Sequence, residues 1–68
     1  MADRYEIRIK AHLSDDRTRA FEGMRITRQS NGETVISGPV VDQAALHGLL
    51  IRIRDLGVPL LLVKRLDY

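Results

Sequence analysis

Residues 39–59 read PVVDQAALHGLLIRIRDLGVP and carry the signals of one helix together with both of its ends. Asp42 is a good N-cap, because its carboxylate can accept a hydrogen bond from a free N–H of the first helical turn. Gly57 suits the left-handed residue that ends a helix, and Pro59 prevents the helix from continuing. We therefore expect one well-defined helix between Asp42 and Gly57.

The two faces of this helix differ in character. At about 100° per residue, one stripe is apolar and is expected to cover the core; it consists of Leu46, Leu49, Leu50, Ile53 and Leu56. The opposite face carries Ala44, Gly48 and Ile51. A glycine exposed in mid-helix costs about 1 kcal/mol relative to alanine. Two explanations stay open for Gly48. It is either an exposed position without a special role, or part of a patch of small residues that lets another chain approach closely.

The first predicted strand covers residues 5–13, where apolar and polar side chains alternate as in a half-buried strand. Its polar face is mostly basic and includes Arg8 and Lys10. Residues 14–23 follow and are expected to form one or two helical turns, since Ser, Asp and Gly stand at suitable ends.

Two further strands are predicted at residues 24–29 and 33–38, joined through an Asn-Gly pair that is typical of hairpins. A two-residue loop would place Ile26 and Ile36 on opposite faces. A three-residue loop with a left-handed Gly32 pairs the two isoleucines on one face. The second register is therefore expected.

The last predicted strand, residues 60–66, is apolar on both faces. We expect Leu60 and Leu62 on one side and Leu61 and Val63 on the other, and the sequence does not decide which pair faces the helix. Strands that are apolar on both sides are usually covered on both sides. Because one helix covers only one side of a sheet, the simplest second cover is another copy of the chain.

These elements predict a single small α+β domain over residues 1–68, a two-layer sandwich with one main helix on one face of a four-stranded sheet. The order is β-β-β-α-β with a short helical turn after the first strand. If the first three strands pair as antiparallel neighbours, a right-handed crossover through the helix makes the last strand parallel to the first. The expected sheet is therefore mixed, in the order 3-2-1-4.

Composition narrows the classes of function. The 68 residues contain no cysteine, so neither a disulfide framework nor a thiolate metal site is expected. Two histidines give no metal site by themselves, and no cofactor motif is present. A chain of this length is marginally stable alone, so packing or oligomerisation must add stability. The longest apolar run is too short to span a membrane, and a cytoplasmic protein without a membrane partner is expected.

The segment GPVVDQAALHGLL at residues 38–50 and the segment IRDLGVPL at residues 53–60 resemble a family of short, uncharacterised bacterial proteins with a GPVxDQAALHGLL…IRDLGxPL signature. The resemblance covers roughly the C-terminal half closely and the remainder in outline. It implies no catalytic, cofactor-binding or metal-binding residues for this chain.

The first functional hypothesis is a self-associating, homodimeric module for protein interaction or regulation, with an unknown further protein partner also open. Its expected interaction surface consists of Arg8, Lys10, Ala44, Gly48, Ile51, Leu60 and Leu62. Whether self-association uses the sheet or the outer helix face stays open.

Nucleic-acid binding through a basic sheet face is the alternative hypothesis, although aromatic residues for base stacking are few. No enzyme is predicted: His47 is the one candidate base with any context, and no nucleophile or orienting partner accompanies it. We expect His47 to be a partly buried histidine that bonds a backbone carbonyl or Gln43.

Overall fold

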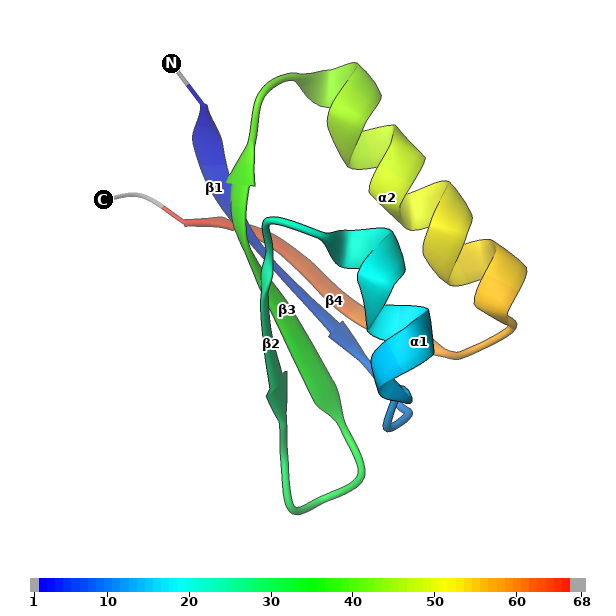
Figure 1. Cartoon of the computed structure of the whole chain (residues 1–68). Coiled ribbons are helices and arrows are strands. Elements are labelled where there is room, and N and C mark those ends of the chain that lie inside the picture. The colour runs from blue at the N-terminus through cyan, green and yellow to red at the C-terminus, as the bar shows by residue number, and fades with distance from the viewer. Residues whose placement is uncertain (1, 67–68) are drawn as a thin grey trace.

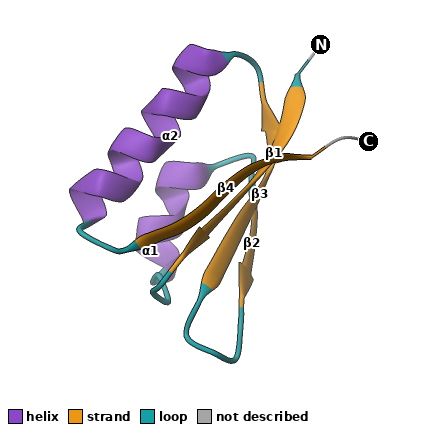
Figure 2. Ribbon diagram, turned by 180° about the vertical axis from the view of Figure 1, so that it is seen from behind, coloured by secondary structure: helices purple, strands orange, loops and turns teal. Residues whose placement is uncertain are grey.

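The structure is a computed structural model that describes residues 2–66; the ends of the predicted domain, residue 1 and residues 67–68, lie outside this range. Its elements are β1 (Asp3–Ile9), α1 (Asp15–Thr18), a 3₁₀ turn η1 (Arg19–Phe21), β2 (Arg25–Arg28), β3 (Thr34–Val40), α2 (Gln43–Leu56) and β4 (Leu60–Leu66). One layer is the sheet, and the helical segments form the other (Figures 1 and 2). The predicted two-layer α+β architecture is confirmed.

The sheet order is β2-β3-β1-β4, and each pair of neighbouring strands is antiparallel. The predicted mixed sheet in the order 3-2-1-4 is therefore wrong. The short helical segment after β1 carries the chain to the far edge of the sheet, and β3 then returns into the space between β2 and β1. The result is a β-α-β-β-α-β chain with the interleaved topology of ferredoxin-like, split βαβ folds.

The hairpin between β2 and β3 has the predicted register. Ile26 lies opposite Ile36, and Gly32 has the left-handed φ of 86° that the loop requires. At the other end of this pair the two backbones approach closely: a Cβ added at Gly38 would lie 3.3 Å from the Cα of Met24. Glycine at position 38 is thus part of how β2 and β3 pack.

The predicted ends of α2 are confirmed. Asp42 Oδ1 accepts a hydrogen bond from the backbone N–H of Ala45 at 2.8 Å. Gly57 is left-handed, with φ 72°, and its N–H donates to the Arg54 carbonyl at 3.0 Å. A carboxylate near the first N–H groups and a left-handed glycine after the last turn satisfy groups that the helix itself leaves unpaired.

The core lies between α2, η1 and one face of the sheet. Its buried apolar residues are Tyr5, Ile7, Ile9, Leu13, Phe21, Ile36, Val40, Leu46 and Ile53. The predicted apolar stripe of α2 faces this cluster, with two of its residues buried and the other three partly buried against it.

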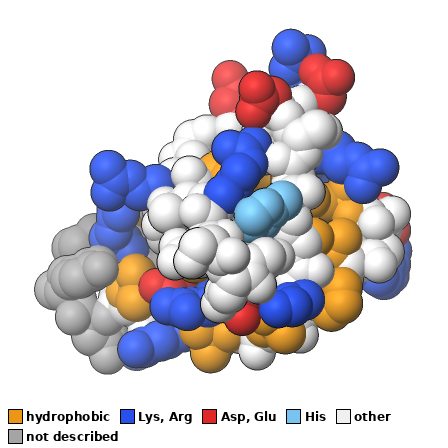
Figure 3. Space-filling model, turned by 90° about the horizontal axis from the view of Figure 1, so that it is seen from below, with side chains coloured by type: hydrophobic (Ala, Val, Ile, Leu, Met, Phe, Trp, Pro, Cys, Tyr) orange, Lys and Arg blue, Asp and Glu red, His pale blue; other side chains and the backbone are white. Residues whose placement is uncertain are grey.

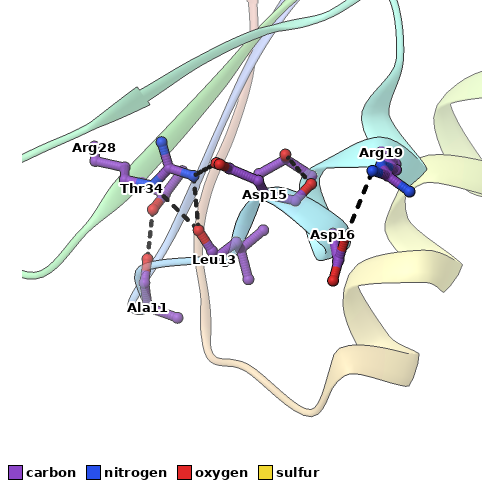
Figure 4. A network of polar contacts seen from close by, with 8 residues as sticks. Ala11, Leu13, Asp15, Asp16, Arg19, Arg28 and Thr34 are labelled. Atoms are coloured by element: carbon purple, nitrogen blue, oxygen red, sulfur yellow. Dashed lines mark hydrogen bonds and ion pairs between the residues drawn. The ribbon is translucent and has the colours of Figure 1, made fainter.

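Strand β1 ends at Ile9, earlier than the predicted residue 13. After Ile9 the chain no longer pairs within the sheet, and side chains of the β2–β3 hairpin donate hydrogen bonds to its carbonyl groups (Figure 4). The Thr34 hydroxyl donates to the carbonyl of Ala11. The Arg28 guanidinium donates twice to the carbonyl of Leu13, at 3.1 Å from Nε and 2.8 Å from Nη2.

Candidate interaction surfaces

The outer strand β4 is the most exposed apolar element of the chain. Four consecutive side chains are substantially exposed: Leu60 by 47%, Leu61 by 48%, Leu62 by 36% and Val63 by 38%. Within the described residues, β4 pairs with β1 alone and forms one edge of the sheet. An exposed apolar edge strand presents backbone donors and acceptors to another strand.

The opposite edge of the sheet has the reverse character. Strand β2 has only four residues, and exposed arginines stand at both of its ends, Arg25 and Arg28. Short length and charge are common means of preventing an edge strand from pairing with another chain. Strand β2 is therefore a short, charged edge, whereas β4 is a longer edge that exposes a run of apolar side chains.

The register of β4 shows which of its apolar residues lie on the helix side of the sheet, and it corrects one prediction. Leu62 lies opposite Arg8 on the open face, whereas Leu60 lies opposite Ile9, which is buried on the helix side. A register shift between Arg8 and Ile9 makes Leu61 the extra residue. Because an extra residue reverses the alternation of side chains, Leu60 and Leu62 do not share a face as expected.

Most of the charged side chains on the open face of the sheet are basic. Cross-strand pairing places Arg25, Ser37, Glu6 and Lys64 in one row that crosses all four strands. The next row contains Arg8, whose Nε donates to Glu6 Oε2 at 2.9 Å. This row and its neighbour form the predicted basic sheet face.

Lys10, also predicted for this surface, follows the end of β1, and its Nζ donates to the Asn31 carbonyl of the hairpin at 3.0 Å. In the view from below, lysine and arginine side chains are spread over the surface with hydrophobic side chains between them (Figure 3).

The predicted outer face of α2 is only partly correct. Ala44 is exposed and Ile51 is exposed by 47%. Gly48 is half-buried instead and lines a hollow between α2, the chain after η1 and the end of β3. Sequence reasoning singled out Gly48 but missed the hollow, because its other wall comes from residues far away in the chain.

The hollow has a volume of about 460 Å³. Its lining is mostly apolar, with one acidic and one basic side chain: Ala2, Glu22, Met24, Pro39, Val40, Val41, Ala45, Gly48, Leu49 and Arg52.

The histidines are both exposed. The expectation of a partly buried His47 is wrong: it lies on the solvent side of α2, and Gln43 instead donates to the Tyr5 hydroxyl at 3.2 Å. His12 Nε2 lies 2.8 Å from the Gln29 carbonyl oxygen. Among residues 2–66, no group of three or more His, Cys, Asp or Glu side chains is arranged to hold a metal ion. Across the same range, no helix combines the length and apolar character needed to cross a membrane.

Fold and surfaces together define a small α+β protein of split βαβ topology, with one sheet face uncovered and one apolar strand at the edge. The chain belongs to the family described as Domain of unknown function (DUF8691), whose model matches residues 4–64. This agrees with the expected membership of an uncharacterised family. No curated protein and no solved structure is significantly similar to the chain.

Proposed function

We propose that this protein is a self-associating interaction or regulatory module that forms a homodimer by pairing β4 with β4 of a second copy. The observation that carries the proposal is the exposure of four consecutive apolar residues on an edge strand, Leu60 to Val63. Antiparallel pairing about a two-fold axis would extend the sheet across both copies.

A second copy suits this edge because the strand is divided into an apolar and a basic half. In an antiparallel pair centred on Val63, the basic residues Lys64 and Arg65 lie opposite Leu62 and Leu61 of the other copy, and not directly opposite their own counterparts. The long stems of lysine and arginine can cover apolar surface while their charges stay in water.

Magnitudes indicate a dimer of moderate affinity. Covering the exposed half of one such side chain contributes about 1 kcal/mol, so the four from each copy contribute roughly 8 kcal/mol per dimer. Association costs about 4–15 kcal/mol in lost freedom. Backbone hydrogen bonds between the two β4 strands must supply the remaining free energy of association. We therefore expect a dissociation constant in the micromolar range.

The test is the solution mass by light scattering on a sizing column, from low to high micromolar protein. Wild type is expected to reach the dimer mass. Leu61→Lys is expected to remain monomeric, because it puts a charge into the apolar edge at a position that is already exposed. Thr27→Lys also introduces a lysine at an exposed position of an edge strand, β2; this variant is the control and is expected to dimerise like wild type.

Other results would contradict this assignment. A wild type that stays monomeric at high micromolar concentration removes the homodimer. A monomeric Ile51→Lys variant beside a dimeric Leu61→Lys variant would transfer the interface to the outer face of α2. Loss of the dimer in Arg8→Glu alone would transfer it to the open face of the sheet.

A second candidate function is nucleic-acid binding, favoured by the basic row on the open face. Arg25 and Lys64 stand at opposite sides of the sheet in this row, with Glu6 between them. Tyr5 and Phe21 are the aromatic residues of the described chain, and both are buried. Such a face would contact phosphates and would not stack bases, so binding would be strongly salt-dependent and tolerant of sequence.

Fluorescence polarisation of a labelled oligonucleotide at several salt concentrations tests this second candidate. Removing one phosphate contact with Arg25→Ser is expected to reduce the slope of log K against log salt by about 1. Arg17→Ser, an exposed change on α1 at the helix side, is the control and should leave the slope unchanged. Equal effects of the two variants, or no binding at low salt, would remove the candidate.

A further inference from the structure

Gly48 has no explanation in the packing of its own chain. It lies in the middle of α2, where glycine weakens a helix relative to alanine. A Cβ added there would meet no heavy atom within 4 Å, so no close approach inside the molecule requires glycine. The space above Gly48 belongs to the hollow, which a larger side chain would partly fill.

The hollow is large enough to hold a small molecule. Its volume of about 460 Å³ lies within the usual range for ligand clefts, about 300–1,000 Å³. Met24, Val40 and Leu49 provide apolar surface from three different elements of the fold. An apolar group could therefore replace water over Gly48 without a change in the backbone.

Two residues of opposite charge, Glu22 and Arg52, also line the hollow. Arg52 comes from α2, and its Nη1 donates to the Ala20 carbonyl, which leaves further N–H groups of the guanidinium for a ligand. Glu22 follows η1, two residues after Ala20. Within residues 2–66, no ion pair joins Glu22 to Arg52.

We propose that this hollow binds a small apolar zwitterion of the α-amino-acid class, with its carboxylate on Arg52, its ammonium on Glu22 and its apolar side chain over Gly48. The guanidinium matches a carboxylate through parallel hydrogen bonds. A plain carboxylate would meet the repulsion of Glu22, and a plain amine that of Arg52. A ligand that carries both charges complements both residues.

No residue of β4 lines the hollow, so this proposal does not depend on self-association. L-Phenylalanine is the probe, titrated into ¹⁵N-labelled protein while amide chemical shifts are recorded. Gly48 and Leu49 are expected to shift and saturate. N-acetyl-L-phenylalanine lacks the ammonium, and L-phenylalaninamide lacks the carboxylate. Each is expected to bind about tenfold more weakly, since each loses one charged hydrogen-bonding group.

Three variants assign the contacts. Arg52→Gln should weaken the binding of phenylalanine about tenfold, and this variant should bind phenylalanine no more tightly than the amide. Glu22→Gln should bind phenylalanine no more tightly than the N-acetyl compound. Gly48→Leu should fill the hollow and prevent binding, with an unchanged or raised thermal midpoint, because leucine is a better helix former. Arg54→Gln, an exposed arginine on α2 outside the hollow, is the matched control.

Several results would overturn the proposal. Shifts located away from the hollow, equal affinity for the three probes, or undiminished binding to Gly48→Leu would each do so. Shifts of the hollow residues with protein concentration alone would assign this surface to a second copy of the chain. If Gly48→Leu fails to fold, the comparison of Arg52→Gln with Arg54→Gln decides the matter.

Discussion

At the scale of single residues, two neighbouring side chains hold the chain that follows β1. Thr34 and Arg28 are cross-strand partners in the hairpin, and they donate to the carbonyls of Ala11 and Leu13 after these leave the sheet. The Arg28–Asp15 ion pair beside them, at 3.1 Å, is largely exposed and is therefore worth little by itself. The bonds to backbone carbonyls are the contacts that hold this loop.

Thr34→Val tests that role. The side chain is fully buried, and valine keeps its shape while removing the donor to the Ala11 carbonyl. We expect a loss of about 1–2 kcal/mol in the free energy of unfolding, because a carbonyl loses its partner. Urea unfolding measures the change. Thr27→Val, at an exposed position of β2, is expected to stay within about 0.5 kcal/mol of wild type. Equal stabilities of the two variants would contradict the argument.

At the scale of elements, two glycines have opposite roles. Gly38 lies in β3 with φ 156°, and an added Cβ would lie 2.9 Å from Met24 Sδ and 3.3 Å from Met24 Cα. The flexible sulfur can move, whereas the Cα cannot move without shifting β2. Gly48 lies in α2 with open space around it. The strand pair requires its glycine, and the helix does not.

Alanine at each position separates the two cases. Gly38→Ala is expected to lower the free energy of unfolding by about 1–3 kcal/mol, through backbone strain and crowding against Met24. Gly48→Ala is expected to raise it by about 0.5–1 kcal/mol, since alanine stabilises the middle of a helix. Thermal and urea unfolding of both variants show whether each substitution raises or lowers the free energy of unfolding. A destabilised Gly48→Ala variant would reveal a close contact at that position.

At the scale of the whole molecule, the interleaved topology creates the surfaces. Both helical segments cover the same sheet face, so the other face stays open and gathers Arg8, Arg25 and Lys64 from three strands. The same topology places short, charged β2 at one edge and long, apolar β4 at the other. Pairing through β4 would join the open faces of two copies into one extended basic surface.

The sequence by itself determined the features that depend on neighbours in the chain. The ends of α2 follow from Asp42 and Gly57, which act on backbone groups within one helical turn. The register of the hairpin follows from Gly32 and from the need to keep Ile26 and Ile36 on one face. In both cases, the groups that decide the structure are only a few residues apart.

Only the tertiary structure decided the strand order, the face of Leu60 and the surroundings of Gly48. Strand order depends on where a short helical segment crosses the sheet, which no local pattern encodes. One extra residue in β4, set by its pairing with β1, moved Leu60 to the helix side. Glu22 and Met24 meet α2 across the hollow only after the chain has folded. These features come from contacts between distant segments, and local propensity carries no information about such contacts.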